Sequence, residues 1–268
     1  MEKYIHGYTE LESLRLANQA RTLAELLHHD SIFPENSRIL EVGCGTGAQT
    51  VILARQNPDI AITAIDISLE SLESARDSVD AAGCGNVVFE QSDLFNLPFK
   101  EQSFDHIFVC FVLEHLDAPV QALTILKKFL RPGGSLTVIE GDHGSVFFAP
   151  ASDDAVRAIA CQIELQARSG GNANIGRELY PLLREAGFAS VAVAPRMVYV
   201  DASKPWLVEG FTKNTFTAMI EGVREKAIQS GLITAELFDK GITDLYRTTE
   251  DDGVFCYTFF KAFAVVEN

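Results

Sequence analysis

The stretch Ile39-Leu40-Glu41-Val42-Gly43-Cys44-Gly45-Thr46-Gly47 decides the fold of this chain. An apolar strand contains an acidic residue near its end and is followed by three glycines in the spacing G-x-G-x-G. Glycine lets the backbone turn sharply at the carboxyl end of a strand and approach a ligand closely, because no Cβ stands in the way. The pattern is typical of a loop that binds a nucleoside cofactor, and it predicts an enzyme.

The spacing of the glycines separates two classes of cofactor. A dinucleotide-binding loop has the pattern G-x-G-x-x-G, whose third glycine allows close helix packing beside a pyrophosphate. Here the third glycine comes one residue earlier. The carboxylate of Glu41 suits a ligand that carries an ammonium or sulfonium group, and it repels a pyrophosphate. These two features favour S-adenosylmethionine over NAD.

Two further strands lead into acidic residues. The strand over residues 60–65 runs into Asp66, 19 residues beyond Gly47, where a βαβ unit places a carboxylate against both ribose hydroxyls. The strand over residues 87–91 leads to Asp93 and Leu94. Here Asp93 is expected to accept a hydrogen bond from the adenine amino group, while Leu94 covers the ring. Three strand ends therefore converge on one nucleoside.

The rest of the chain alternates between helical and strand signals. One or two helices are expected over residues 9–29, before the first strand. Further helices are predicted over residues 48–56, 68–82, 119–130, 152–168 and 176–186. Further strands are predicted over residues 104–110, 135–140, 190–200 and 254–266. Strand and helix in alternation predict a doubly wound α/β fold with helices on both faces of a parallel sheet.

Five motifs in this order resemble the class I S-adenosylmethionine-dependent methyltransferases. Besides the glycine loop and the strand-end acids, they include FDHIFVC at 104–110, LEHL at 113–116 and LRPGG at 130–134. Within that superfamily the chain is similar to the small-molecule group that includes the ubiquinone and menaquinone methyltransferases, methyltransferase type 11. The likeness is detailed over roughly residues 38–141. It implies a Rossmann-like seven-stranded sheet of order 3-2-1-4-5-7-6, with the last strand antiparallel.

The resemblance also implies S-adenosylmethionine as cofactor, S-adenosylhomocysteine as product, and a set of binding residues. Glu41 would orient the amino group directly or through water, Asp66 would bind the ribose, and Cys110 would present its backbone to the methionyl ammonium. The full set within the motifs is Glu41, Gly43, Cys44, Gly45, Gly47, Asp66, Ile67, Asp93, Leu94 and Cys110. Ile67 would lie beside the adenine.

A helix before the first strand covers the cofactor in related small-molecule enzymes and supplies a tyrosine and an arginine. Tyr8 and Arg15 stand seven residues apart here, which places them on one helical face. Arg15 would pair bidentately with the methionine carboxylate. The alternative is a surface arginine beside a packed tyrosine.

Two histidines are candidates for proton chemistry. His143 follows the fifth predicted strand in the sequence Gly141-Asp142-His143-Gly144, where substrates enter doubly wound folds. Asp142 and His143 would form an acid–histidine couple that deprotonates the acceptor, whereas the alternative is a turn stabilised by its own aspartate. His115 lies near the mouth of the site, where it would either transfer a proton or only shape the turn. No metal is required for methyl transfer.

The segment 201–253 interrupts the family pattern between the last two strands. Its apolar residues recur at helical spacing, which predicts a helical insertion that either packs on the domain or forms a substrate lid. Pro195 places the preceding strand at an edge or a bulge. Aromatic side chains that offer surface for an apolar or planar acceptor are Tyr180, Tyr199, Trp206, Phe211 and Phe216. We expect one domain over 1–268, with residues 1–37 as an N-terminal helical cover.

Composition limits the class of partner. The formal charge of −15 would repel a phosphate backbone, so nucleic acid substrates are disfavoured and a small-molecule acceptor is expected. No apolar run approaches the ~20 residues of a membrane span, and the N-terminus lacks the apolar core of a signal peptide, so we expect a cytoplasmic protein. The five cysteines form no C-x-x-C pair, which argues against a disulfide framework or zinc site.

Two rival classes stay open from the sequence. One is a nucleotide-dependent oxidoreductase that uses NAD on a similar sheet. The other is a protein that binds S-adenosylmethionine without transferring its methyl group. The acceptor atom and the oligomeric state are not determined by the sequence.

Overall fold

A computed structural model of the chain describes residues 10–267, with side chains described from residue 15 onward. One sheet has the strand order β3-β2-β1-β4-β5-β7-β6. The strands are β1 (Arg38–Val42), β2 (Ala61–Asp66), β3 (Val87–Gln91), β4 (Phe104–Cys110), β5 (Leu130–Ala149), β6 (Ser190–Asp201) and β7 (Val254–Val265). Neighbours among β1 to β5 pair in parallel, and β7 is antiparallel to both β5 and β6. The predicted fold class and strand order are confirmed.

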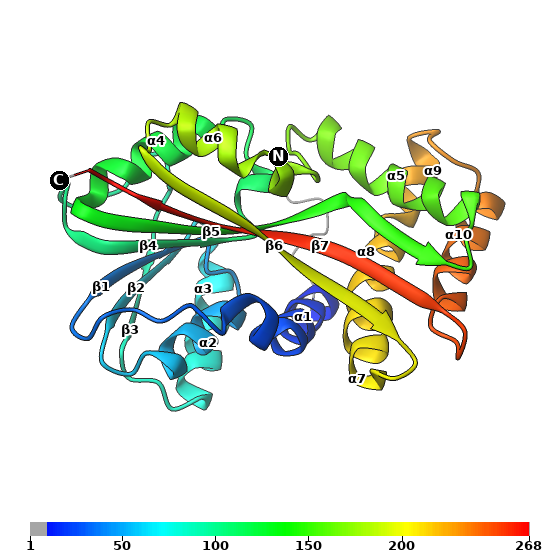
Figure 1. Cartoon of the computed structure of the whole chain (residues 1–268), viewed down its shortest axis with the longest axis horizontal. Helices are drawn as coiled ribbons and strands as arrows, with labels where there is room; N and C mark the ends of the chain where they lie inside the picture. The colour runs from blue at the N-terminus through cyan, green and yellow to red at the C-terminus, as the bar shows by residue number, and fades with distance from the viewer. Residues whose placement is uncertain (1–9, 268) are drawn as a thin grey trace.

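Helices cover both faces of this sheet (Figure 1). On one face lie α1 (Glu10–His28), α2 (Ala48–Gln56) and α3 (Leu69–Ala81), and on the other lie α4 (Pro119–Phe129) and α6 (Leu179–Glu185). Successive residues of a strand point to opposite faces. Accordingly Ile39 of β1 joins the core cluster that contains Leu53 of α2, while Leu40 joins the cluster that contains Leu123 of α4.

The fifth strand is longer than its sequence predicts. β5 does not end at Glu140 but continues to Ala149, so the alternative of a turn at residues 141–144 is wrong. The reason is β7, which offers a paired backbone beyond that point: Asp142 lies opposite Thr258, and after a register shift Phe147 lies opposite Cys256. In consequence β5, β6 and β7 extend past the other strands and carry a second group of helices (Figure 1).

The segment between β6 and β7 is helical, as expected. It comprises α7 (Pro205–Leu207), the π-helix η3 (Val208–Thr217), α8 (Ala218–Glu221), α9 (Arg224–Gln229) and α10 (Ala235–Arg247), and α10 packs on α5 (Asp153–Arg168). Gly210 of η3 approaches α1 so closely that a Cβ there would lie 2.3 Å from the Thr22 hydroxyl. β6, with Pro195, lies at the edge of the sheet, as predicted. Within residues 10–267 no helix has both the length and the apolar character needed to cross a bilayer.

Candidate active site

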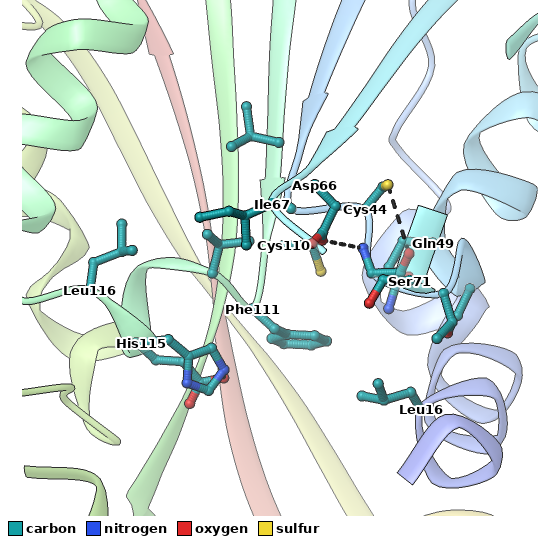
Figure 2. A pocket seen from close by; sticks show the side chains of 18 of the residues that line it. Leu16, Cys44, Gln49, Asp66, Ile67, Ser71, Cys110, Phe111, His115 and Leu116 are labelled. Carbon is teal, nitrogen blue, oxygen red and sulfur yellow. Dashed lines mark hydrogen bonds and ion pairs between the residues drawn. The ribbon is translucent and has the colours of Figure 1, made fainter. Parts of the chain in front are cut away.

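A cavity of about 780 Å³ lies at the carboxyl ends of β1, β2 and β4 (Figure 2). Segments far apart in the chain line it: the glycine loop 43–46, residues 92–95, the turn 110–112, and the η1 turn (Leu113–His115). α1 and η3 close the remaining side with Arg15, Leu16, Phe211 and Phe216 among others. The volume lies within the range of small-molecule and cofactor sites.

The three glycines of the loop have different tasks. All three have a positive φ, of +69° at Gly43, +51° at Gly45 and +80° at Gly47. A Cβ at Gly43 would lie 2.5 Å from a Val112 methyl, and one at Gly47 would lie 2.9 Å from the Ala75 backbone of α3. At Gly45 nothing lies within 4 Å, and this residue lines the cavity. The backbone at Gly45 is therefore open toward the cavity, while Gly47 serves helix packing and does not line the cavity.

The strand-end acids converge as predicted. Asp66 accepts hydrogen bonds from the amides of Gly45 and Ser68, both at 2.9 Å, so its carboxylate is fixed between the loop and the start of α3. Figure 2 shows this carboxylate beside the loop. Asp93 also lines the cavity, where it accepts from the Phe95 amide at 2.9 Å. Arg15, Cys44, Ile67, Leu94 and Cys110 line the same cavity.

Glu41 lies under the loop and not in the cavity wall. Its side chain is buried, and one carboxyl oxygen has no hydrogen-bond partner among the described residues. Burial raises the pKa of this carboxyl to about 7; the Thr50 hydroxyl opposes the shift and the charge of Asp66 adds to it. Because Glu41 is buried and does not line the cavity, its carboxyl is not in a position to contact the ligand's amino group directly. Tyr8, which was expected to contact the cofactor together with Arg15, lies outside the described residues.

His143 is placed in the cavity wall by the unexpected length of β5. The residue is 6% exposed, and its Nδ1 lies 2.9 Å from the Tyr257 hydroxyl on β7. Its Nε2 is buried and has no hydrogen-bond partner among the described residues. Burial lowers the pKa of the imidazole, so the ring stays neutral at physiological pH. A neutral imidazole with one free nitrogen is suited to accept a proton or to bind a polar group of a ligand.

The predicted Asp142–His143 couple is wrong. Consecutive residues of a strand point to opposite faces, and the Asp142 carboxylate accepts two hydrogen bonds from Arg177, at 2.8 and 2.6 Å. His143 instead pairs with Tyr257. His115 does line the cavity, and its Nε2 lies 3.7 Å from a Glu114 carboxylate oxygen.

The half of the cavity away from the glycine loop is largely aromatic. Phe211 and Phe216 of η3 are buried against Tyr257, with ring centroids 5.8 and 5.5 Å from its ring. Phe111, Met219 and Phe259 complete this wall, which we call the acceptor half together with His143 and Tyr257. The inserted segment thus both packs on β7 and lines the cavity. Tyr180, Tyr199 and Trp206 are exposed and do not line it, contrary to expectation.

Three residues of the site carry no local sequence signal. Tyr257 reaches His143 across 114 residues of sequence, through the register of β5 and β7. Glu140 accepts hydrogen bonds from backbone amides that follow β4. Phe111 has φ +58°, and a bulky residue in a sequence gives no sign that its backbone adopts a positive φ. Within the described residues no group of three or more histidine, cysteine or acidic side chains is arranged to hold a metal ion.

Comparison with known proteins shows to which family the chain is related. The family model described as a methyltransferase domain matches residues 34–187. The 27-O-demethylrifamycin SV methyltransferase of Amycolatopsis mediterranei (strain S699) is 30% identical over 230 residues, which cover 85% of this chain and 78% of that protein. The malonyl-[acyl-carrier protein] O-methyltransferase of Paenibacillus sp. (strain JDR-2) is 31% identical over 185 residues, which cover 65% of this chain and 66% of that protein. In other relatives the match with this chain covers between 24% and 62% of the relative's length.

Solved structures show the same fold at low sequence identity. The phosphoethanolamine N-methyltransferase 2 of Haemonchus contortus, in complex with S-adenosyl-L-methionine, has a TM-score of 0.56 and 15% identity, and the match covers 92% of this chain and 52% of that one. The [4+2]-cyclase SpnF has a TM-score of 0.54 and 20% identity, covering 94% of this chain and 81% of that one. From its sequence match, its fold and the geometry of its glycine loop, the chain belongs to the methyltransferase domain family of class I S-adenosylmethionine-dependent methyltransferases.

Proposed function

We propose that this methyltransferase transfers the methyl group of S-adenosylmethionine to a hydroxyl oxygen of a small, largely apolar molecule. The observation that carries the proposal is the buried, unpaired Nε2 of His143 in a largely aromatic wall. Relatives named for methylation at oxygen support the choice of acceptor atom. The charge of −15 supports an acceptor that is not a nucleic acid.

The cofactor fits the half of the cavity at the glycine loop. Gly45 leaves open space where a Cβ would stand, and Asp66 and Asp93 stand at the ends of β2 and β3. We infer that Asp66 binds the ribose, that Asp93 and Leu94 bind the adenine beside Ile67, and that Arg15 pairs with the carboxylate. Bound S-adenosylmethionine supplies an electrophilic methyl group and leaves as S-adenosylhomocysteine.

The chain's own contribution to the reaction is to orient the acceptor and to take its proton. The acceptor oxygen bonds to the methyl carbon as the carbon–sulfur bond breaks, and its proton passes to Nε2 of His143. For Nε2 to accept, Nδ1 must carry the other proton and donate to the Tyr257 oxygen. Burial raises the pKa of Tyr257 well above its usual range, so this partner stays an uncharged phenol. Phe211 and Phe216 exclude water from the acceptor.

The proposal is tested by measuring S-adenosylhomocysteine formation with a panel of small phenols and hydroxylated polyketides. His143→Ala should lower kcat by roughly 100-fold or more, the usual contribution of a general base, with S-adenosylhomocysteine affinity changed less than about threefold. His115→Ala is the matched control. The Nε2 of His115 faces the Glu114 carboxylate and not the proposed acceptor, so this variant should retain kcat within about tenfold. Equal kcat in His143→Ala and wild type would reject His143 as the base.

The dependence of the rate on pH gives a second check. Because burial lowers the pKa of His143, its neutral form persists below the usual imidazole range. The rate should therefore fall in acidic solution with a midpoint below about 6.5, the usual pKa of imidazole. Binding of S-adenosylmethionine without turnover of any acceptor would favour the alternative of a cofactor-binding protein.

A further inference from the structure

The turn after β4 has an unusual backbone conformation at the wall of the cavity. Phe111 has φ +58°, a region that bulky residues rarely adopt. Its ring points into the cavity (Figure 2), and its centroid lies 5.6 Å from that of the Phe259 ring. A strained residue of this kind persists only when the surrounding structure holds it in place.

β5 supplies the acceptors that hold this turn. The Phe111 amide donates to the Ile139 carbonyl at 2.9 Å. The next two amides, of Val112 and Leu113, donate to one and the same oxygen, Oε1 of Glu140, at 3.0 and 2.7 Å. Glu140 is fully buried and does not itself line the cavity. Three successive amides are therefore satisfied by two consecutive residues of the neighbouring strand.

The same turn joins the two halves of the cavity. On one side Val112 fills the space above Gly43, where a Cβ would lie 2.5 Å from its methyl group. On the other side the chain continues into η1, whose Glu114 and His115 line the cavity. A movement of this turn would therefore shift the cofactor loop relative to the part of the cavity wall that Glu114 and His115 form.

We propose that Glu140 is a positioning residue that fixes the turn 111–113 and thereby holds the Phe111 ring as a divider between the cofactor loop and the rest of the acceptor half. The divider has a use only if both halves are occupied, so this inference rests on the proposed function. If the ring divides the cavity in this way, an acceptor must pass the face of Phe111 to reach the methyl group, and this restricts which acceptors fit. Glu140 acts through the backbone and does not touch the reacting atoms.

The chemistry of Glu140 allows a sharp test of this role. Burial and the charge of Glu114 raise the pKa of its carboxyl well above the usual range, and the backbone hydrogen bonds oppose that shift. A neutral amide is therefore a close substitute: Glu140→Gln keeps an oxygen that accepts from both amides. Glu140→Leu has a similar volume and no acceptor, so it leaves two N–H groups unpaired.

The experiment compares these two variants by hydrogen exchange of residues 111–116 and by calorimetry with S-adenosylhomocysteine. Glu140→Leu should speed exchange in this segment and weaken S-adenosylhomocysteine binding, each by roughly tenfold, the loss expected for unpaired buried donors. Glu140→Gln should stay within about threefold of wild type in both measurements. If Glu140→Leu does not fold, Glu140→Asp replaces it, because a carboxyl one methylene shorter does not reach both amides.

Two outcomes would overturn the inference. One is exchange and affinity in Glu140→Leu that stay at the wild-type level, and the other is equal damage in both variants, which would make charge the important property. Thr248→Val removes a buried hydroxyl that donates to the Leu245 carbonyl, and neither residue lines the cavity, so this variant controls for general loss of stability. Failure of the acceptor panel would reject the proposed function and leave the exchange result unaffected, so the two failures are distinguishable.

Discussion

At the scale of single residues, the buried carboxyl of Glu41 shows how the fold sets the charge of a group. Its pKa is raised to about 7, chiefly by burial, whereas in the unfolded chain it ionises near its usual value. Between these two values the folded protein holds a proton that the unfolded chain releases. The free energy of unfolding therefore falls as pH rises through this window, by about 3 kcal/mol in total.

Glu41→Gln removes that titration, because the amide is neutral at every pH. Relative to wild type, the variant should gain about 3 kcal/mol of stability between pH 4.5 and pH 8. Urea unfolding of both proteins across this range measures the difference. Parallel stability profiles for the two proteins would show that Glu41 is ionised in the folded state at all these pH values.

The positive φ of Phe111 can be tested with two substitutions that both delete the ring. Glycine adopts φ +58° without a Cβ penalty and alanine does not, so Phe111→Gly should be more stable than Phe111→Ala by roughly 1 kcal/mol. Thermal unfolding of both variants measures the order. At the neighbouring Val112, with φ −116°, the order should reverse and alanine should be the more stable. An alanine more stable than glycine at position 111 would contradict the assigned backbone conformation.

At the scale of elements, the π-helix η3 decides which side chains of the inserted segment reach the cavity. Over ten residues its wider turns place Phe211, Thr215 and Phe216 in the cavity wall, and the Thr215 hydroxyl donates to the Gly210 carbonyl five residues earlier at 2.7 Å. π-helical turns are rare and occur often at functional sites. A helical periodicity in the sequence does not distinguish this winding from an α-helix.

Deletion of the exposed Asn214 should convert η3 to α-helical winding. One residue of an α-helix turns by about 100°, so Phe211 and Phe216, then four residues apart, would still lie on one face of the helix. Helix content measured by circular dichroism should be preserved, and both S-adenosylhomocysteine affinity and KM for an acceptor from the panel should change less than about threefold. A KM raised about tenfold would show that the π-helical winding itself is needed to position this wall.

The expected elements agree with the structure where the pattern that predicts them is local. Residues 48–56 form α2 and residues 87–91 form β3 as predicted, because their periodicity and end signals lie within the elements. β5 was predicted to end nine residues too early, because its continuation depends on pairing with β7, which lies more than 100 residues later in the chain. Local pattern carries no information on such a partner.

At the scale of the whole molecule, Lys261 ties the last strand to the first helix. Its ammonium donates to the Leu27 carbonyl at the end of α1, to Asp30 and to Ser31, at 3.0, 2.6 and 2.9 Å. Burial lowers the pKa of this lysine, and Asp30 opposes that shift. The interaction closes the N-terminal helix, one wall of the cavity, onto β7, the strand that carries Tyr257.

Lys261→Met keeps the stem of the side chain and removes these donors. The free energy of unfolding should fall by about 2 kcal/mol, because the Leu27 carbonyl and Asp30 lose a buried partner. Lys240→Met is the matched control: Lys240 pairs with Asp154 and Asp244 at the surface, where solvent screens ion pairs, so its loss should cost clearly less stability than the loss of Lys261. Urea unfolding measures both, and equal losses would show that the Lys261 contacts are no stronger than surface ion pairs.

The strand order was implied by the resemblance to a known family. The sequence by itself determined the alternation of helices and strands, the glycine loop and the acids at the ends of β2 and β3. These follow from short patterns whose physical meaning is local: hydrophobic periodicity, glycines where φ is positive, and a carboxylate that follows a strand. Only the tertiary structure decided that His143 pairs with Tyr257 and that Asp142 pairs with Arg177. It also decided that Glu41 is buried and that Glu140 holds the turn at Phe111. Each of these depends on strand register or on packing between distant segments, which no local pattern of residues records.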